Sequence, residues 1–210
     1  MNWLAHLRLA RQTPLDRLGQ LSGDFVRGPL TDDLHPLIRR GVREHRSLDV
    51  WVDDHPLMRE LRQEIPREFR RFAGILLDLT TDHVLARDWQ SLAPGPGLEP
   101  FARQVAEDVQ EHLDLCPERL AAIGRRRDIG SLLLSYEAIE GLELAIDRIG
   151  RRFRRPIDLT PSMAWIVDHE ARLTEVTRVL VRDAERFLAN RRSQEDEEGR
   201  VESAAIETGD

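Results

Sequence analysis

An Asp-His doublet lies where the sequence pattern calls for apolar residues. Between residues 69 and 89, apolar side chains recur at helical spacing. This predicts a helix with one buried face, formed by Phe72, Ile75, Leu76, Leu79 and Ala86. Asp82 and His83 fall on that same face. Two ionisable side chains in a core need hydrogen-bond partners or a metal ion to offset their burial. A hydrogen-bonded structural pair is the commoner case, and a metal site is the alternative.

A second segment shows the same departure from its pattern. Residues 36–52 predict a helix whose apolar face contains Ile38, Gly41, Val42, Leu48 and Val52. His45 lies in the middle of that face, and Asp49 follows one turn later at its edge. An imidazole and a carboxylate at this spacing can share a divalent ion such as manganese, iron or zinc. The alternative is a buried His45–Asp49 hydrogen bond that only joins two helices.

Periodicity leaves two further residues undecided. Asp24 lies just outside the apolar arc formed by Leu18, Leu21 and Phe25. Gly23 precedes it and would allow a close backbone approach, or a bend that turns Asp24 inward. Otherwise Asp24 is a solvated helix acid. His6, on a short apolar segment near the start of the chain, is open to the same two interpretations.

The elements that must position these residues are all predicted to be helices. Thr13-Pro14 and Thr160-Pro161 each combine an N-cap residue with a proline suited to the first helical position. A short apolar segment spans 2–10, and helices are expected at about 14–26, 36–52, 55–65, 67–89, 98–114, 117–127, 130–153 and 160–192. No run of alternating β-branched residues indicates a strand. The prediction is an all-α fold, with about eight helices in a single domain over residues 1–192.

Composition limits the cellular setting. The only cysteine is Cys116, so no internal disulfide can form and a reducing compartment fits. No apolar run approaches the roughly 18 residues that a membrane span needs. The first residues include His6 and Arg8 within their apolar run, unlike a secretory signal. We therefore expect a cytoplasmic protein with no membrane association.

Charge is spread unevenly along the chain. The net charge is −7, and the last twenty residues alone contain seven acids against three arginines. This stretch lacks hydrophobic periodicity, so residues 193–210 are expected to form a disordered acidic tail.

Arginines concentrate near the candidate His-Asp pair. Arg39, Arg43 and Arg46 lie on the segment that carries His45. They would suit a phosphate-bearing substrate or an acidic protein partner, although arginines on a helix are often only a solvated face. Nucleic acid is not an expected partner, because the chain is acidic and no basic stripe alternates with aromatic residues.

Four segments in order resemble one family. Residues 1–10, 19–28, 41–56 and 73–89, with a weaker continuation over 135–152, resemble the acyl carrier protein phosphodiesterase family. That family is similar to the HD-domain metal-dependent phosphohydrolases. The resemblance implies a single HD-like helical domain and a divalent metal, with Mn²⁺ first and Mg²⁺ or Fe²⁺ as alternatives. It also implies hydrolysis of the phosphodiester that joins 4′-phosphopantetheine to a serine of holo-acyl carrier protein.

The resemblance also implies roles for particular residues. It makes Asp24, His45, Asp82 and His83 the expected metal ligands and His6 a further functional candidate. A metal ion would lower the pKa of a bound water and neutralise phosphate charge, and Asp49 or His6 could then move a proton. Arg39, Arg43 and Arg46 would hold the substrate and attract the acidic carrier protein.

Two other functions fit the same residues. One is an HD-like phosphohydrolase of a nucleotide or another small phosphoester, which the same ligands would allow. The other is a helical binding protein that docks acidic partners through its arginines and has no catalytic activity. The oligomeric state is not predicted.

Overall fold

Helices form the whole regular structure of the described chain. The computed structural model describes the backbone of residues 1–207 and the side chains of residues 1–197, and this part contains no strand. The α-helices are α1 (Trp3–Leu9), α2 (Pro14–Ser22), α3 (Pro36–Asp54), α4 (Pro56–Glu64), α5 (Ala73–Arg87), α6 (Trp89–Leu92), α7 (Leu98–Glu111), α8 (Glu118–Arg126), α9 (Ile129–Ser135), α10 (Ile139–Arg152), α11 (Ser162–Asp168) and α12 (Glu170–Glu207). Two 3₁₀ turns, η1 (Arg70–Phe72) and η2 (Leu113–Leu115), precede α5 and α8. The predicted all-α class is confirmed.

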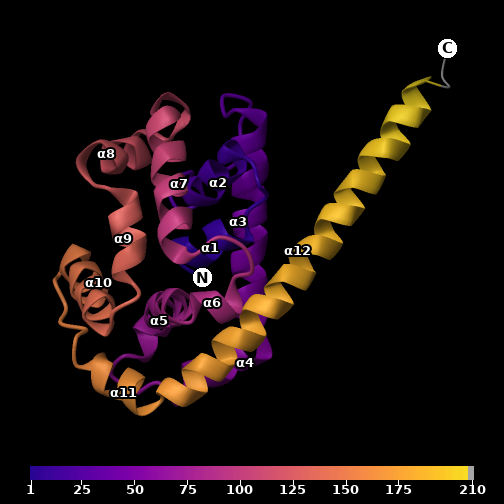
Figure 1. Ribbon diagram of the computed structural model, residues 1–210. Helices are drawn as coiled ribbons and strands as arrows, with labels where there is room; N and C mark the ends of the chain where they lie inside the picture. Colours follow the sequence, from indigo (N-terminus) through magenta and orange to yellow (C-terminus); the bar gives the residue numbers. More distant parts are fainter. Residues whose placement is uncertain (208–210) are drawn as a thin grey trace.

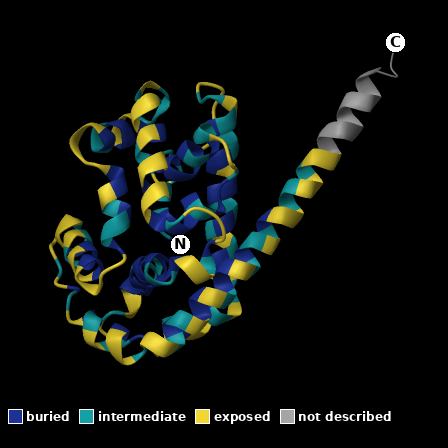
Figure 2. Cartoon of the chain, in the orientation of Figure 1, coloured by how far each residue is buried: buried dark blue, intermediate teal, exposed yellow. Residues whose placement is uncertain are grey.

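Helix α5 is the centre of the fold (Figure 1). It contacts α1, α10 and α12, and Figure 2 shows it as buried over most of its surface. Eleven of its fifteen residues are buried, so neighbours cover it on nearly every side. The helix expected here is therefore present, but it buries more than the single face expected from periodicity.

Helices α2 and α3 pack unusually closely, because each contributes a glycine to the contact. A Cβ atom at Gly19 would lie 2.7 Å from the Cα of Gly41. Any side chain at either position would separate the two backbones. This contact brings the end of α2, and the Asp24 segment that follows it, against the middle of α3.

Two of the long predicted helices are each divided into two. The segment expected at 130–153 forms α9 and α10, and the segment expected at 160–192 forms α11 and α12. The first break is set by packing, because a Cβ atom at Gly141 would lie only 1.7 Å from the carbonyl oxygen of Ser135. At the second break, the rings of Trp165 and His169 stack with centroids 4.6 Å apart.

Most of the segment expected to be a disordered tail continues the last helix in the structure. Helix α12 continues to Glu207 and projects from the body (Figure 1), while the end of the expected tail, 208–210, lies outside the described residues. The segment contains good helix formers and no proline, so nothing in it stops the helix. The start of the expected tail also contacts the body, since Glu195 forms an ion pair with Arg11.

The interior is one apolar core shared by most of the helices. Fully buried members include Leu4 of α1, Leu18 of α2, Ile38 of α3 and Leu180 of α12. Among the described helices, none combines the length and the apolar character that a membrane crossing requires.

Candidate metal centre

Three of the sequence-predicted residues meet at one point. Nitrogen atoms of His6 and His45 and a carboxylate oxygen of Asp49 all lie within 4.8 Å of one another. His6 Nε2 is 3.0 Å from Asp49 Oδ1, and His45 Nε2 is 3.1 Å from Asp49 Oδ2. The two imidazole rings stack with their centroids 3.9 Å apart.

Asp24 lies beside this cluster. Its Oδ1 is 3.6 Å from His45 Nε2, and its side chain is half exposed. The indole nitrogen of Trp3 donates a hydrogen bond of 2.9 Å to Asp24 Oδ2, which fixes the carboxylate and leaves Oδ1 towards His45. The cluster therefore has two carboxylates and two imidazoles, a donor set that suits manganese or iron.

Three elements deliver these side chains. Helix α3 carries His45 and Asp49 one turn apart, α1 carries His6, and Asp24 follows the end of α2. Gly23 is essential to the approach, because a Cβ atom there would lie 2.2 Å from the ring carbons Cγ and Cδ2 of His45. The expectation that this glycine permits a close approach is confirmed.

The hydrogen bonds around His6 determine which of its two ring nitrogens carries the proton. The Gln20 amide nitrogen lies 3.4 Å from Glu44 Oε2, so the Gln20 oxygen faces His6 Nδ1 at 3.1 Å. An oxygen only accepts, so Nδ1 carries the proton and Nε2 of the neutral ring presents a lone pair. A lone pair and a carboxylate at 3.0 Å repel each other unless positive charge lies close by; the Met1 ammonium, 3.7 Å from Asp49 Oδ1, supplies part of that charge, and a metal cation would supply more. The residues therefore fit a bound cation.

Electrostatics within the cluster favour charge on the acids. Burial alone would raise the pKa of Asp49, but the hydrogen bond from His45 outweighs it and holds that pKa far below its ordinary value. Asp24 behaves in the same way, since its hydrogen bond with His45 outweighs burial and lowers its pKa. Burial and the charge of His45 lower the pKa of His6. Burial also opposes charge on His45, but Asp24 and Asp49 outweigh it and raise the pKa of His45 to about 9.

Asp82 lies outside the cluster and holds the start of α1 instead. It is fully buried, and its two oxygens accept hydrogen bonds from the backbone N–H groups of Leu4 and Ala5 at 2.8 and 3.0 Å. These are free N–H groups of the first turn of α1, which has no cap from its own Asn2. Burial raises the pKa of Asp82 to about 7. Asp82 thus positions the helix that carries His6.

His83 also lies apart from the cluster. Its Nδ1 donates a hydrogen bond of 2.8 Å to the carbonyl oxygen of Tyr136, and burial lowers its pKa. It lines a cavity of about 360 Å³ between α5 and the segments that contain Ile139 and Ile166. The structure therefore joins only His45 and Asp24 of the four expected ligands, and it adds His6 and Asp49.

The three expected substrate-binding arginines have different surroundings. Arg39 forms an ion pair with Asp32, and Arg46 donates hydrogen bonds of 2.8 Å to the carbonyl oxygens of Val26 and Gly28. Arg43 is exposed, and no carboxylate of the described side chains lies within ion-pair distance of it. None of the three contacts the cluster directly.

The sequence interpretation missed the two residues that orient the ligands. Gln20 fixes His6 and Trp3 fixes Asp24, through the hydrogen bonds described above. Gln20 was detectable in principle as a polar residue between Leu18 and Leu21 on an apolar helix, where it is buried. Trp3 gave no such signal.

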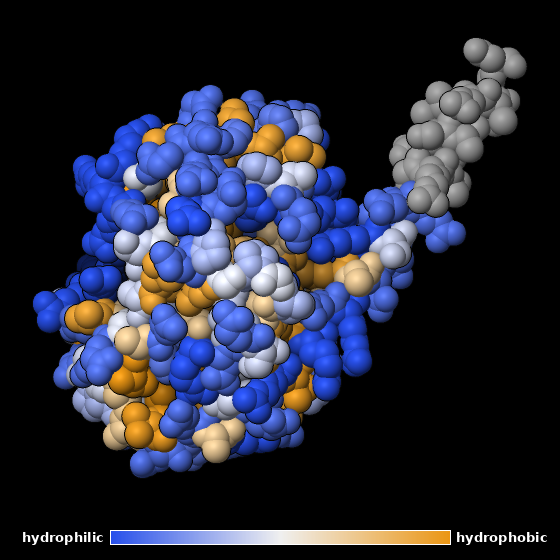
Figure 3. All heavy atoms as spheres, in the orientation of Figure 1, coloured by the Kyte–Doolittle hydropathy of each residue, from blue (hydrophilic) through white to orange (hydrophobic). Residues whose placement is uncertain are grey.

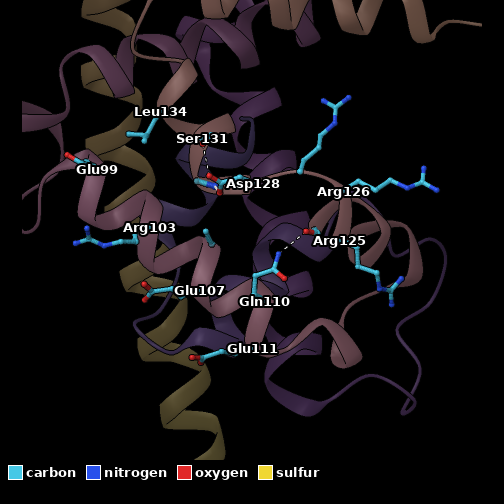
Figure 4. Close-up of a pocket in the computed structure, with 14 residues that line it drawn as sticks. Glu99, Arg103, Glu107, Gln110, Glu111, Arg125, Arg126, Asp128, Ser131 and Leu134 are labelled. Carbon is cyan, nitrogen blue, oxygen red and sulfur yellow. Dashed lines mark hydrogen bonds between the residues drawn. The ribbon is translucent and has the colours of Figure 1, made fainter.

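A large cavity elsewhere contains none of these residues. It has a volume of about 830 Å³ and lies between α7, α8 and α9 (Figure 4). Its lining mixes both signs of charge, with Glu107 and Glu111 near Arg103 and Arg125. This mixture selects no class of ligand.

Comparison with known proteins identifies the family. The family model "Acyl carrier protein phosphodiesterase" matches residues 1–184. A protein of that name from Serratia proteamaculans is 42% identical over 57% of this chain and 62% of its own length. One from Photorhabdus laumondii is 32% identical over 81% of this chain and 86% of its own length. One from Escherichia coli is 34% identical over 74% of this chain and 80% of its own length.

No solved structure gives a significant match to the chain. The family model nevertheless covers both the segment that supplies the His-Asp cluster and most of the helical body. The chain belongs to the acyl carrier protein phosphodiesterase family.

Proposed function

We propose that the chain is a metal-dependent phosphodiesterase of holo-acyl carrier protein. It would hydrolyse the phosphodiester between 4′-phosphopantetheine and a serine of the carrier, giving apo-acyl carrier protein and 4′-phosphopantetheine. The family match and the printed names of the relatives support the substrate. The cluster of His6, His45 and Asp49, with Asp24 beside it, supports the chemistry. The protein would act in the cytoplasm, where its carrier substrate is a soluble partner.

The cluster would hold the cation through His6, His45 and Asp49, and Asp24 lies beside this set at its open side. A divalent ion supplies positive charge for the phosphate and lowers the pKa of a bound water. Mn²⁺ is the proposed ion, since it accepts both imidazole and carboxylate donors, and Fe²⁺ or Mg²⁺ are the alternatives. Asp82 and His83 are not part of the proposed ligand set.

The remaining residues hold the ligands in place and handle protons. Gln20 keeps the His6 proton on Nδ1, so the lone pair of Nε2 stays available to bind a metal ion. Trp3 holds Asp24 at the open side of the cluster. Asp24 is therefore placed to accept a proton from the attacking water, while Asp49 is engaged by both histidines. Hydrolysis forms a new phosphorus–oxygen bond from water, and the serine oxygen leaves with a proton.

Intact-mass analysis of holo-acyl carrier protein tests this proposal. Wild type with added Mn²⁺ should convert the holo form to the apo form, and a chelator should stop the conversion. His45→Asn should be inactive, because it removes a central ligand while the α3 backbone stays helical. A holo form that remains unchanged in every metal tested would contradict the proposal. Hydrolysis of a nucleotide monoester instead would favour a small-molecule phosphohydrolase.

A further inference from the structure

A groove beside the cluster combines free positive charge with exposed apolar surface. It has a volume of about 600 Å³ and lies between α3 and α12, and we refer to it as the α3–α12 groove. Its lining includes three arginines and a single acid, Asp54. That acid already pairs with Arg59 at 2.6 Å, so it does not neutralise the groove arginines.

Arg43 and Arg46 carry charge that no described carboxylate neutralises, whereas Arg191 is paired within its own helix. Arg43 is exposed, and neither Arg43 nor Arg46 lies within ion-pair distance of a carboxylate among the described side chains. Arg46 uses its guanidinium on backbone carbonyls. Arg191 of α12 forms an ion pair with Glu195 through its buried Nε, at 3.4 Å. Such a concentration of positive charge stands out in a protein of net charge −7.

The floor of the groove has the composition of a protein-binding surface. Val50 is 65% exposed, the highest value among the large apolar side chains of the described region. Next to it, the rings of Trp51 and Phe187 stack with centroids 5.2 Å apart. Aromatic residues and arginines around an exposed apolar anchor are the usual content of interaction hot spots. Figure 3 shows apolar surface bordered by hydrophilic side chains where α12 leaves the body.

The groove lies next to the candidate metal centre along α3, although no residue of the cluster lines it. Arg46 and Val50 of the groove alternate along α3 with His45 and Asp49 of the cluster. Arg46 also donates to the carbonyl oxygens of Val26 and Gly28, which lie two and four residues after Asp24. A macromolecule seated in the groove would therefore lie next to the open side of the cluster.

We infer that the α3–α12 groove docks an acidic amphipathic helix of the carrier protein, an inference that rests on the proposed function. The apolar stripe of that helix would lie on Val50, Trp51 and Phe187, and its acids would face the three arginines. Charge complementarity selects an acidic partner for this groove, because the rest of a chain of net charge −7 would repel such a partner. This assignment replaces Arg39, which lies outside the groove, with Arg191.

Binding of apo-acyl carrier protein separates docking from catalysis, because the apo form has no phosphodiester to occupy the cluster. Arg43→Glu and Val50→Glu should each weaken apo-carrier binding about tenfold or more, as expected for hot-spot residues. Added salt should weaken binding to wild type more than binding to Arg43→Glu. Arg119→Glu is the matched control, since this exposed arginine of α8 makes the same charge change outside the groove. Its dissociation constant should stay within about twofold of wild type.

Thermal melts check that the two groove variants fold, which their exposure leads us to expect. Dissociation constants equal to that of Arg119→Glu would overturn the groove assignment. So would a concentration-dependent dimer that Val50→Glu abolishes, because a second copy would then be the occupant. Cleavage of holo-carrier by wild type with unchanged docking in the variants would leave the proposed function intact. A wild type that binds but never cleaves would contradict the proposed function alone.

Discussion

At the scale of single residues, a proton and a metal ion compete for the imidazole of His45. Its raised pKa of about 9 means that, without metal, Asp24 and Asp49 hold a protonated imidazole between them. A metal ion needs the neutral ring, so binding must displace that proton. Apparent Mn²⁺ affinity should therefore rise between about pH 6.5 and 9, with proton release measurable by titration calorimetry in buffers of different ionisation enthalpy. Affinity that is flat over this range would show that His45 is not a ligand.

The same group links pH to stability in the absence of metal. Because its folded pKa lies above the ordinary 6.5, protonated His45 contributes stability that is fully present below pH 6.5 and is lost as pH rises through about 9. The melting temperature of chelator-treated protein should fall over that window, and added Mn²⁺ should reduce the fall. His45→Asn should lack this part of the pH dependence, and a variant that keeps it would assign the effect to another group.

Asp82 and His83 allow the structural and ligand roles to be separated. Asp82→Ala would leave two buried N–H groups of α1 unpaired, so it should lower the free energy of unfolding by ~2 kcal/mol or more. The folded protein should still bind Mn²⁺ in both Asp82→Ala and His83→Ala. Asp49→Ala should lose Mn²⁺ while remaining folded. If folded His83→Ala loses Mn²⁺, His83 is a ligand, as expected from the sequence, and the assignment made here is wrong.

At the scale of elements, the α2–α3 contact makes a sharp prediction about glycine. Gly41→Ala would place a methyl group against the α2 backbone and should cost about 1–3 kcal/mol of stability. It should also weaken Mn²⁺ binding, because His45 lies one turn further along α3. Gly74→Ala is the matched control in α5, where nothing lies within 4 Å of the new Cβ. It should be neutral or stabilise by ~0.5–1 kcal/mol, measured by chemical denaturation. Equal losses in both variants would remove close packing as the cause.

Element types were predictable from the sequence, and element junctions were not. The apolar spacing around Leu76 and Leu79 correctly predicts a central helix, because burial of apolar surface depends on local periodicity. The break after Ser135 depends on a contact with Gly141, and the attachment of the end of α12 to the body depends on an ion pair between Glu195 and Arg11. Such tertiary contacts have no signature in a window of a dozen residues.

At the scale of the whole molecule, the site forms because three segments converge. The pair His45 and Asp49 was visible as a local violation on one helix. The inclusion of His6 depends on how α1 packs on α2 and α5, which no one of these segments encodes by itself. The search for polar residues on the apolar face of a predicted helix also selected Asp82, and Asp82 is indeed buried. Its sequence position alone could not show whether it caps a helix or binds a metal ion. Local pattern identifies unusual residues, and the fold decides what they do.

Hydrogen bonds to one buried carboxylate attach α12 to the body of the molecule. Glu44 of α3 is buried, and it accepts hydrogen bonds from Arg192 at 2.8 and 3.0 Å and from Arg11 at 2.8 Å. Arg192 also donates to the carbonyl oxygen of Leu9, so a single side chain joins α12 to α1 and α3. Burial would raise the pKa of Glu44, but the hydrogen bonds from Arg192 and Arg11 lower it. The stability from Glu44 is therefore present above its ordinary pKa of 4.5 and is lost as pH falls further.

Removing Arg192 should consequently destabilise the whole body. Arg192→Ala leaves the buried Glu44 carboxylate with only Arg11 as a charged partner. The loss should lower the free energy of unfolding by about 3 kcal/mol and the melting temperature by ~6–12 °C. Arg186→Ala, at a 70% exposed arginine of the same helix, should change it by ~2 °C or less. A chain ending at Glu197 keeps every contact described for α12 and should melt like wild type, whereas one ending at Asn190 should behave like Arg192→Ala. If both truncations melt like wild type, the Glu44 network is not what holds α12 in place.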